Sequence, residues 1–315
     1  MPETEIINNK TTILPFQEAL FDRLCAVGRA CLLTSRAAIG LKLRANFLLI
    51  GQSGSGKTFL AHALADEMQV PFFSASTSDW ILLGCSNRGS SSTWPSIFDF
   101  IERSIKKQVA IIFVDELDKC NHDSNWNAFL RAEVFSLCDC RIPTNLNDLD
   151  DDLISESRIA EASAFLANKT MILAGGAFQD IWERKSSPSM GFITTDDSVN
   201  LPDPEDLVKT LSRELINRFS SELFILPELT EMDYKRMVDT VADRVPEIWR
   251  ATFLELGHSR ISEALRHRKG ARYMEEILLS AIVEERGGLA NFVPSPVATE
   301  RTEENGPELM DLQIF

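Results

Sequence analysis

The sequence predicts an α/β fold in which a parallel sheet is flanked by helices and followed by a small all-helical domain. Three observations predict it. Short apolar runs typical of strands alternate with segments of helical periodicity up to about residue 228. A glycine-rich loop joins the apolar run after residue 45 to the next helical segment. Beyond residue 229 only helical patterns remain, and 315 residues with 44% hydrophobic content suffice for two domains.

The elements of the first domain are expected in the following order. Apolar residues at helical spacing predict a helix within about residues 15–39. Buried strands are predicted at four apolar runs, Phe47–Ile50, Val70–Phe73, Ala110–Val114 and Thr170–Ala174. Helical patterns at about 59–68 and 97–105 separate the first three strands. Because strands and helices alternate, the sheet is expected to be parallel.

The second domain is expected to hold four helices, at about residues 230–245, 246–256, 259–268 and 271–286. The acidic run 145–156 is predicted to be a solvated loop or a helix start, and the polar run 186–204 a long exposed loop. We divide the chain into a helical lead-in (1–44), an α/β nucleotide-binding domain (45–228), a helical lid (229–286) and a flexible tail (287–315).

The segment Gly51–Thr58 fits the phosphate-binding pattern G-x-x-x-x-G-K-[ST] between a predicted strand and a predicted helix. Its glycines allow a tight turn that brings backbone N–H groups to phosphate oxygens, and the helix adds the positive end of its dipole. Lys57 is predicted to reach the β- and γ-phosphates of ATP, and the Thr58 hydroxyl to ligate Mg²⁺. The residues of this segment that we assign to the nucleotide site are Gly51, Ser53, Gly54, Ser55, Gly56, Lys57, Thr58 and Phe59.

The third predicted strand ends in two acids, Asp115 and Glu116. The carboxyl ends of parallel strands are where ligands bind, so both side chains are expected beside the phosphates. Asp115 is predicted to hold Mg²⁺ and Glu116 to polarise the attacking water. A carboxylate next to the γ-phosphate is repelled by it and has little structural use, so the pair favours ATP hydrolysis over binding alone.

The charge of the chain limits its partners. The formal net charge is −15, which disfavours nucleic acid or an anionic membrane surface as the main partner. No apolar run approaches the roughly 20 residues that span a bilayer, and the first residues are acidic, unlike a signal peptide. These features predict a cytoplasmic protein.

The six cysteines form no regular disulfide framework, and free thiols are expected in a reducing compartment. Cys120, His122, Cys138 and Cys140 offer a possible zinc set. Their spacing is not a familiar ligand spacing, so buried core thiols are the favoured interpretation.

With these motifs the chain resembles the AAA+ ATPases, and within them the ClpX/HslU-like (Clp/HSP100) unfoldases. The resemblance runs from about residue 45 to 285. The segments that carry it are Ala45–Gly51, Val114–Lys119, Ile172–Phe178, Glu214–Phe219 and Gly270–Arg272. It implies a hexameric ring with ATP and Mg²⁺ as ligands.

The resemblance also implies roles for two arginines. Arg218 falls at the position of the arginine finger, which stabilises charge on the γ-phosphoryl group in a neighbouring subunit. Arg272 falls at the sensor-2 position and is expected to touch phosphate within its own chain. A guanidinium suits both roles because it meets phosphate oxygens bidentately.

Three departures from the ClpX pattern bear on function. The pore-loop segment 83–89 lacks an aromatic residue, although Trp80 and Trp94 flank it and could substitute if they are not core or interface residues. The sensor-1 position falls near Gly175, so the backbone or an ordered water would have to serve there. No Cys-x-x-Cys occurs before the P-loop, so the zinc-binding adaptor domain is expected to be missing and substrate delivery to differ.

Two classes of function follow. The favoured one is an ATP-driven ring motor that remodels or unfolds protein, with a peptidase or other effector docking through Met190-Gly191-Phe192. The alternative is a nucleotide-dependent assembly switch or loader that recruits an effector or a nucleic-acid enzyme without threading polypeptide. Basic residues could give a pore face for nucleic acid, although a solvated helix face is the simpler interpretation; they are Arg88, Arg103, Lys106 and Lys107.

Overall fold

A computed structural model describes residues 13–33, 45–80, 93–120, 127–143, 155–186 and 201–285 of the chain. The predicted pore-loop segment 83–89, the tripeptide 190–192, His122 and the tail lie outside these residues. Among the described helices, none has the length and apolar character required to cross a membrane.

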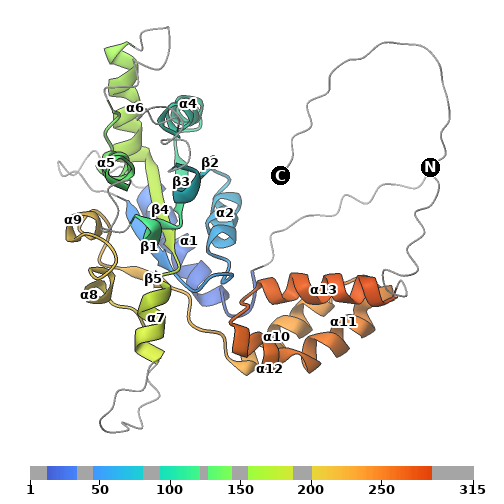
Figure 1. Cartoon of the computed structure of the whole chain (residues 1–315). Helices are drawn as coiled ribbons and strands as arrows, with labels where there is room; N and C mark the ends of the chain where they lie inside the picture. The colour runs from blue at the N-terminus through green and yellow to red at the C-terminus, as the bar shows by residue number, and fades with distance from the viewer. Residues whose placement is uncertain are drawn as a thin grey trace, which may run out of the picture.

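The first domain is built around a parallel sheet (Figure 1). Its strands are β1 (Asn46–Ile50), β2 (Phe72–Ser76), β3 (Ala110–Asp115), β4 (Thr170–Gly176) and β5 (Leu223–Ile225). The spatial order is β2-β3-β4-β1-β5, and every neighbouring pair is parallel. The helices and 3₁₀ turn of this domain are α1 (Glu18–Leu33), α2 (Lys57–Met68), α4 (Thr93–Ile105), η2 (Leu117–Lys119), α5 (Asn127–Cys138), α6 (Glu156–Lys169), α7 (Gln179–Ser186), α8 (Pro204–Leu207) and α9 (Arg213–Ile216). The α/β fold class predicted from the sequence is confirmed.

The strand register brings three functional segments to one edge of the sheet. Ile50, the last residue of β1, pairs with Gly176 at the end of β4. Val114, one residue before the end of β3, pairs with Ala174 of β4. The P-loop, the two acids and the β4 exit therefore lie together at the carboxyl edge, where ligands of open α/β sheets bind.

Two hydrophobic cores cover the two faces of the sheet. Because side chains alternate along a strand, Ile112 and Val114 face one core while Ile111 and Phe113 face the other. Helices α4 and α6 pack on the first face, and α1 and α2 on the second. All residues of β1 and β4 are buried, as expected for central strands covered on both sides.

Helix α1 belongs to this packing although it precedes the P-loop domain in sequence. Its Leu24 and Leu32 are at most 1% exposed and share a core with Leu60 and Leu64 of α2. The helix spans Glu18–Leu33, within the predicted range. Helix α1 therefore covers one face of the sheet together with α2. The domain division at residue 44 stays a prediction.

The lid consists of α10 (Glu231–Ala242), α11 (Glu247–Ser259), α12 (Ile261–His267) and α13 (Arg272–Glu285), so the four predicted helices are confirmed. Figure 1 shows them grouped beside the sheet domain. Their separate core centres on Tyr234 and Tyr273, whose rings meet edge to face at 5.4 Å. Helix α10 begins with a capping box in which the side chains of Thr230 and Asp233 each accept the other's backbone N–H.

Trp80 and Trp94 are each 2% exposed and lie in the core between α4 and the sheet, Trp94 as a residue of α4 itself. The Trp80 indole N–H donates to the Glu133 carboxylate. These side chains are therefore core residues, and the idea that they replace an aromatic pore loop is wrong.

Candidate active site

The P-loop runs from β1 into α2 in a conformation that requires glycine at two positions. Gly54 and Gly56 have φ angles of +78° and +88°, in the left-handed region that other residues rarely adopt. A Cβ on Gly54 would also lie 2.8 Å from the carbonyl oxygen of Lys269 in the lid. Helix α2 begins at Lys57, directly after Gly56, so its N-terminal N–H groups point into the loop as predicted.

The Lys57 ammonium lies inside the curve of the P-loop. Its Nζ donates to the carbonyl oxygen of Gly51 at 2.7 Å and to that of Gln52 at 3.1 Å. Burial lowers the pKa of Lys57, while the charge of Asp115 acts in the opposite direction. A bound phosphate would give this buried cation an anionic partner.

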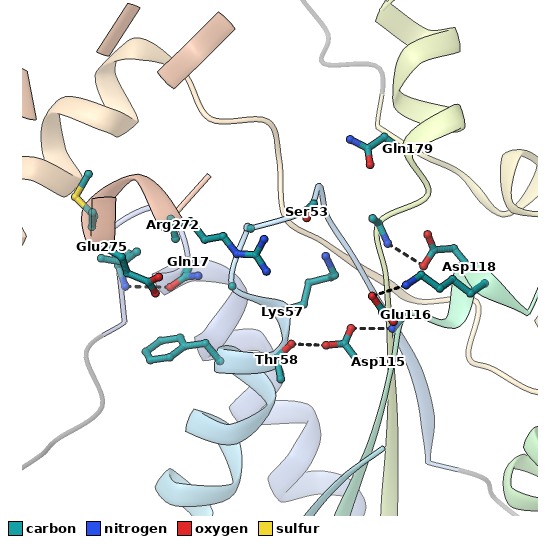
Figure 2. A pocket seen from close by; sticks show the side chains of 18 of the residues that line it. Gln17, Ser53, Lys57, Thr58, Asp115, Glu116, Asp118, Gln179, Arg272 and Glu275 are labelled. Carbon is teal, nitrogen blue, oxygen red and sulfur yellow. Dashed lines mark hydrogen bonds and ion pairs between the residues drawn. The ribbon is translucent and has the colours of Figure 1, made fainter. Parts of the chain in front are cut away.

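Thr58 and Asp115 come together as the sequence predicts. The Thr58 hydroxyl donates to Asp115 Oδ2 at 2.5 Å, and the backbone N–H of Glu116 donates to the other carboxylate oxygen at 2.8 Å (Figure 2). Hydroxyl and carboxylate oxygens beside a phosphate cradle are the ligands that Mg²⁺ takes in nucleotide sites. The two residues therefore fit a magnesium ion, which would neutralise phosphate charge.

The Glu116 carboxylate is fixed by three side chains. Lys119 Nζ lies 2.7 Å from Oε1, and the hydroxyls of Ser78 and Ser76 donate to Oε2 at 2.5 and 3.2 Å. The hydrogen bond from Lys119, followed by that from Ser78, lowers the pKa of Glu116. The residue itself has a φ of +59°, which turns its side chain off the end of β3. The carboxylate is thus kept ionised.

Sequence reasoning missed these three partners. Ser76 pairs with Asp115 across the β2–β3 ladder, and Ser78 follows two residues later. The available signal was the polar residues at the end of β2. Neighbouring parallel strands end at the same edge of the sheet, so these serines could have been expected near the acids that follow β3. Lys119 lies three residues after Glu116 in the η2 turn.

The pH dependence of turnover tests this arrangement. A pKa below the usual Glu value of about 4.3 keeps the Glu116 carboxylate able to accept a proton down to a lower pH. In Lys119→Met the pKa should return towards that value, so the acid limb of the kcat profile should move to higher pH. Lys106→Met, at an exposed lysine of the α4–β3 turn, serves as the control. Superimposable acid limbs for Lys119→Met and wild type, with both folded by circular dichroism, would contradict the assignment.

Asp118 links the η2 turn to the exit of β4. Its carboxylate accepts the backbone N–H groups of Ala177 at 3.2 Å and Phe178 at 3.3 Å. Gly175, near which the sensor-1 position was predicted, has no room for a side chain, because a Cβ would lie 2.7 Å from the Phe113 ring. Gln179, which sequence reasoning missed, lines the cavity four residues later. A polar side chain is therefore present on this side of the site.

The lid rests on the P-loop through the turn between α12 and α13. The Ala271 N–H donates to the Gly54 carbonyl oxygen at 2.8 Å, and a Cβ on Gly270 would lie 2.6 Å from the same oxygen. Arg272 begins α13 and lines the cavity together with Lys57. Figure 2 shows the Arg272 guanidinium next to the tip of Lys57. The predicted sensor-2 residue thus lies in the site of its own chain.

The opposite end of the cavity is apolar and suits a nucleobase. The cavity has a volume of about 670 Å³, and Phe59 lines this end with Leu14, Val241 and Met274. Gln17 is fully buried, and its amide donates to the Ser55 carbonyl oxygen at 2.9 Å. The segment before α1 therefore contacts the P-loop directly, which sequence reasoning missed because nothing local marks such a contact.

The structure places Arg218 away from the nucleotide site of its own chain. Its guanidinium contacts Asp139 Oδ2 at 3.1 Å and lies 4.4 Å from the centre of the Phe135 ring. Its carbonyl oxygen accepts a hydrogen bond from Asn46, the first residue of β1, whereas the P-loop follows the last. The two ends of β1 are separated by roughly 15 Å. In this structure Arg218 therefore does not reach the nucleotide site of its own chain.

The possible zinc set gains no support. Within the described part of the chain, no group of three or more His, Cys, Asp and Glu side chains is placed to hold a metal ion. Burial raises the pKa of the Cys120 thiol to about 12 and raises that of Cys138 as well. None of the described cysteines forms a disulfide.

Residues 47–135 match the family model described as ATPase family associated with various cellular activities (AAA). The chain is 42% identical over 81 residues to the ATP-dependent zinc metalloprotease FtsH 4 of Sphaerobacter thermophilus, which is 26% of this chain and 12% of that protein. It is 40% identical over 82 residues to FtsH of Alkalihalophilus pseudofirmus, covering 26% and 11%. FTSH 5, chloroplastic, of Arabidopsis thaliana gives 38% over 81 residues, covering 26% and 11%. The aligned segment thus spans about an eighth of the length of these relatives.

Residues 47–135 thus match an AAA ATPase domain, and the parallel sheet with its P-loop is the fold of a P-loop nucleotide-binding domain. The relatives are FtsH proteases, and the predicted ClpX/HslU-like branch is not confirmed by them.

Proposed function

We propose that this protein is an ATP-hydrolysing AAA+ ring motor that remodels or unfolds protein substrates. The observation that carries the proposal is the Glu116 carboxylate, held by Ser76, Ser78 and Lys119 at the sheet edge beside Lys57. A site that only bound nucleotide would have no use for a fixed carboxylate at this position. The proposed setting is cytoplasmic.

In the proposed reaction, the P-loop N–H groups and Lys57 hold the triphosphate of ATP, and Thr58 and Asp115 hold its magnesium ion. Glu116 accepts a proton from a water molecule as the water oxygen bonds to the γ-phosphorus. The bond from the γ-phosphorus to the β,γ-bridging oxygen breaks, and ADP and inorganic phosphate result. Arg272 contacts phosphate from the lid, so that nucleotide state is coupled to the lid position.

The protein-remodelling part of the proposal is supported by the FtsH relatives, which are ATP-dependent proteases by name. The finer proposals are a ClpX/HslU-like branch, a hexamer, and docking of a peptidase or other effector through Met190-Gly191-Phe192.

One observation favours the assembly switch as a second candidate. The tryptophans that flank the pore-loop segment are buried, and the segment itself contains no aromatic residue. A switch that recruits an effector needs ATP turnover but no grip on polypeptide.

Measurement of mass and ATPase rate with Mg-ATP, with and without an unfolded polypeptide, tests the proposal. An ATP-dependent hexamer whose turnover rises with polypeptide supports the remodelling motor. A hexamer whose ATP turnover does not change with polypeptide favours the assembly switch. Absence of ATP turnover under all conditions contradicts both proposals.

Mixing two inactive variants tests the role of Arg218 in a neighbouring site. Arg218→Ala keeps its own P-loop but offers no finger, whereas Lys57→Ala lacks a working P-loop but still offers one. Each alone should lose at least about 100-fold in turnover. Because ring interfaces are head to tail, random mixing should restore about a quarter of the wild-type rate. If the mixture is as inactive as its components, while both variants still assemble, Arg218 does not act in trans.

A further inference from the structure

A second cavity lies beside the tip of the P-loop, between helix α7 and the turn that joins α12 to α13. Its volume is about 450 Å³. Ser53, Gln179 and Arg272 line both this cavity and the nucleotide cavity, so the two adjoin. In Figure 2, Ser53 and Arg272 lie next to the tip of Lys57, which marks the phosphate end of the site. We call the second cavity the basic cleft.

The basic cleft concentrates positive charge in a chain whose net charge is −15. Nearby residues of the lid supply it; they are Arg266, Arg268 and Lys269, with Arg272 beyond them. Among the described residues, two acids share the lining, Glu183 and Glu276. Like charges held together repel one another, so this arrangement costs stability unless an anion binds there.

The cations of the basic cleft differ in their partners, and Arg268 lies 3.7 Å from the Glu228 carboxylate. Lys269 is occupied by Glu263 and Glu276, at 3.1 and 2.7 Å. By contrast, Arg266 and Arg272 are exposed, and neither forms a hydrogen bond or ion pair with a described residue. Guanidinium groups with free donors are suited to phosphate oxygens, which they meet in pairs.

We propose that the basic cleft receives inorganic phosphate when it leaves the nucleotide cavity. The proposal rests on ATP hydrolysis as described above. The apolar end of the nucleotide cavity holds the base, and the P-loop with Lys57 closes around the ADP phosphates. The cleft opens from the opposite end, past Arg272, where the cleaved γ-phosphoryl group lies. Arg266 then attracts the doubly charged product away from ADP, so the lid turn that rests on Gly54 also takes part in product release.

Product inhibition tests the proposal on the full chain. Steady-state ATP turnover is measured with increasing inorganic phosphate at constant ionic strength, because screening alone weakens contacts between charges. We expect phosphate to inhibit the wild-type protein, and Arg266→Glu to raise the phosphate inhibition constant about tenfold or more. Inhibition by ADP should stay within twofold of wild type, since ADP is bound by the first cavity.

The matched control is Arg236→Glu, the same charge change at an exposed lid residue on α10 that lines neither cavity. Phosphate should inhibit Arg236→Glu with the same inhibition constant as the wild-type protein. Equal phosphate inhibition constants for all three proteins, with ATP turnover intact, would overturn the basic cleft and leave the proposed function standing. If Arg266→Glu instead changes the mass of the assembly at unchanged phosphate inhibition, the cleft binds an acidic surface of a second copy, and the proposal is wrong.

Should the wild type show no turnover, the proposed function fails, and the cleft is tested separately. Equilibrium dialysis of radiolabelled inorganic phosphate against protein loaded with Mg-ADP then gives the answer. Phosphate bound by wild type and Arg236→Glu but lost in Arg266→Glu supports the cleft, and equal binding by all three overturns it.

Discussion

Glu116→Gln is expected to reduce ATP turnover by about 10²- to 10⁴-fold while leaving ATP binding intact, because the amide cannot accept the proton of the attacking water. The amide is nearly the same size as the carboxylate and can still accept the hydrogen bonds that Ser76 and Ser78 now donate. It loses the ion pair with Lys119. That pair is partly exposed, so its loss should change the free energy of unfolding by less than about 1 kcal/mol.

The measurement combines a single-turnover ATPase assay with binding of a fluorescent ATP analogue. A variant that binds ATP without cleaving it should accumulate in the ATP-bound assembly. Glu161→Gln, the same change at an exposed position of α6, should match the wild type in both assays. Turnover of Glu116→Gln within threefold of wild type would remove this residue as the base, and loss of ATP binding would point to a structural role.

The parts of the site that the sequence predicted are local in the chain. The P-loop, the start of α2 and the acids after β3 each lie within a few residues of a strand end. An apolar run followed by glycines or acids therefore contains the information needed to place them. The four lid helices were predictable for the same reason, because each has its own apolar residues at helical spacing, and α10 also begins with the capping residue Thr230.

The parts that could not be predicted depend on contacts between distant segments. The serines that hold Glu116 lie about 40 residues before it, and only the parallel register of β2 on β3 brings them together. Gln17 reaches the P-loop from the start of α1, and Gly270 reaches it from the lid. Short elements were missed as well, since β5, α8 and α9 have three or four residues each and show no periodicity. The longer helices α5 and α7 were not predicted either.

Lys57→Met should abolish measurable ATP binding, with affinity reduced at least about 100-fold, and leave the folded state as stable as in wild type or more so. The lysine is 8% exposed and its burial lowers its pKa, so without nucleotide its charge is costly to the fold. Two backbone carbonyl bonds offset part of that cost. With ATP bound, the same buried charge meets the β- and γ-phosphates in a site of low dielectric, where charge-assisted bonds are strong.

Thermal unfolding with and without Mg-ATP separates the two effects. Lys57→Met should unfold at the wild-type temperature or above it without nucleotide, but ATP should no longer raise that temperature. Lys107→Met, at an exposed lysine of the α4–β3 turn, should retain the full ATP-dependent shift. An ATP-dependent shift of wild-type size in Lys57→Met would show that the phosphates bind elsewhere. A large drop in its unfolding temperature without nucleotide would show instead that the two carbonyl bonds are needed to hold the P-loop in shape, since the methionine side chain can pack in the same volume but cannot donate to Gly51 or Gln52.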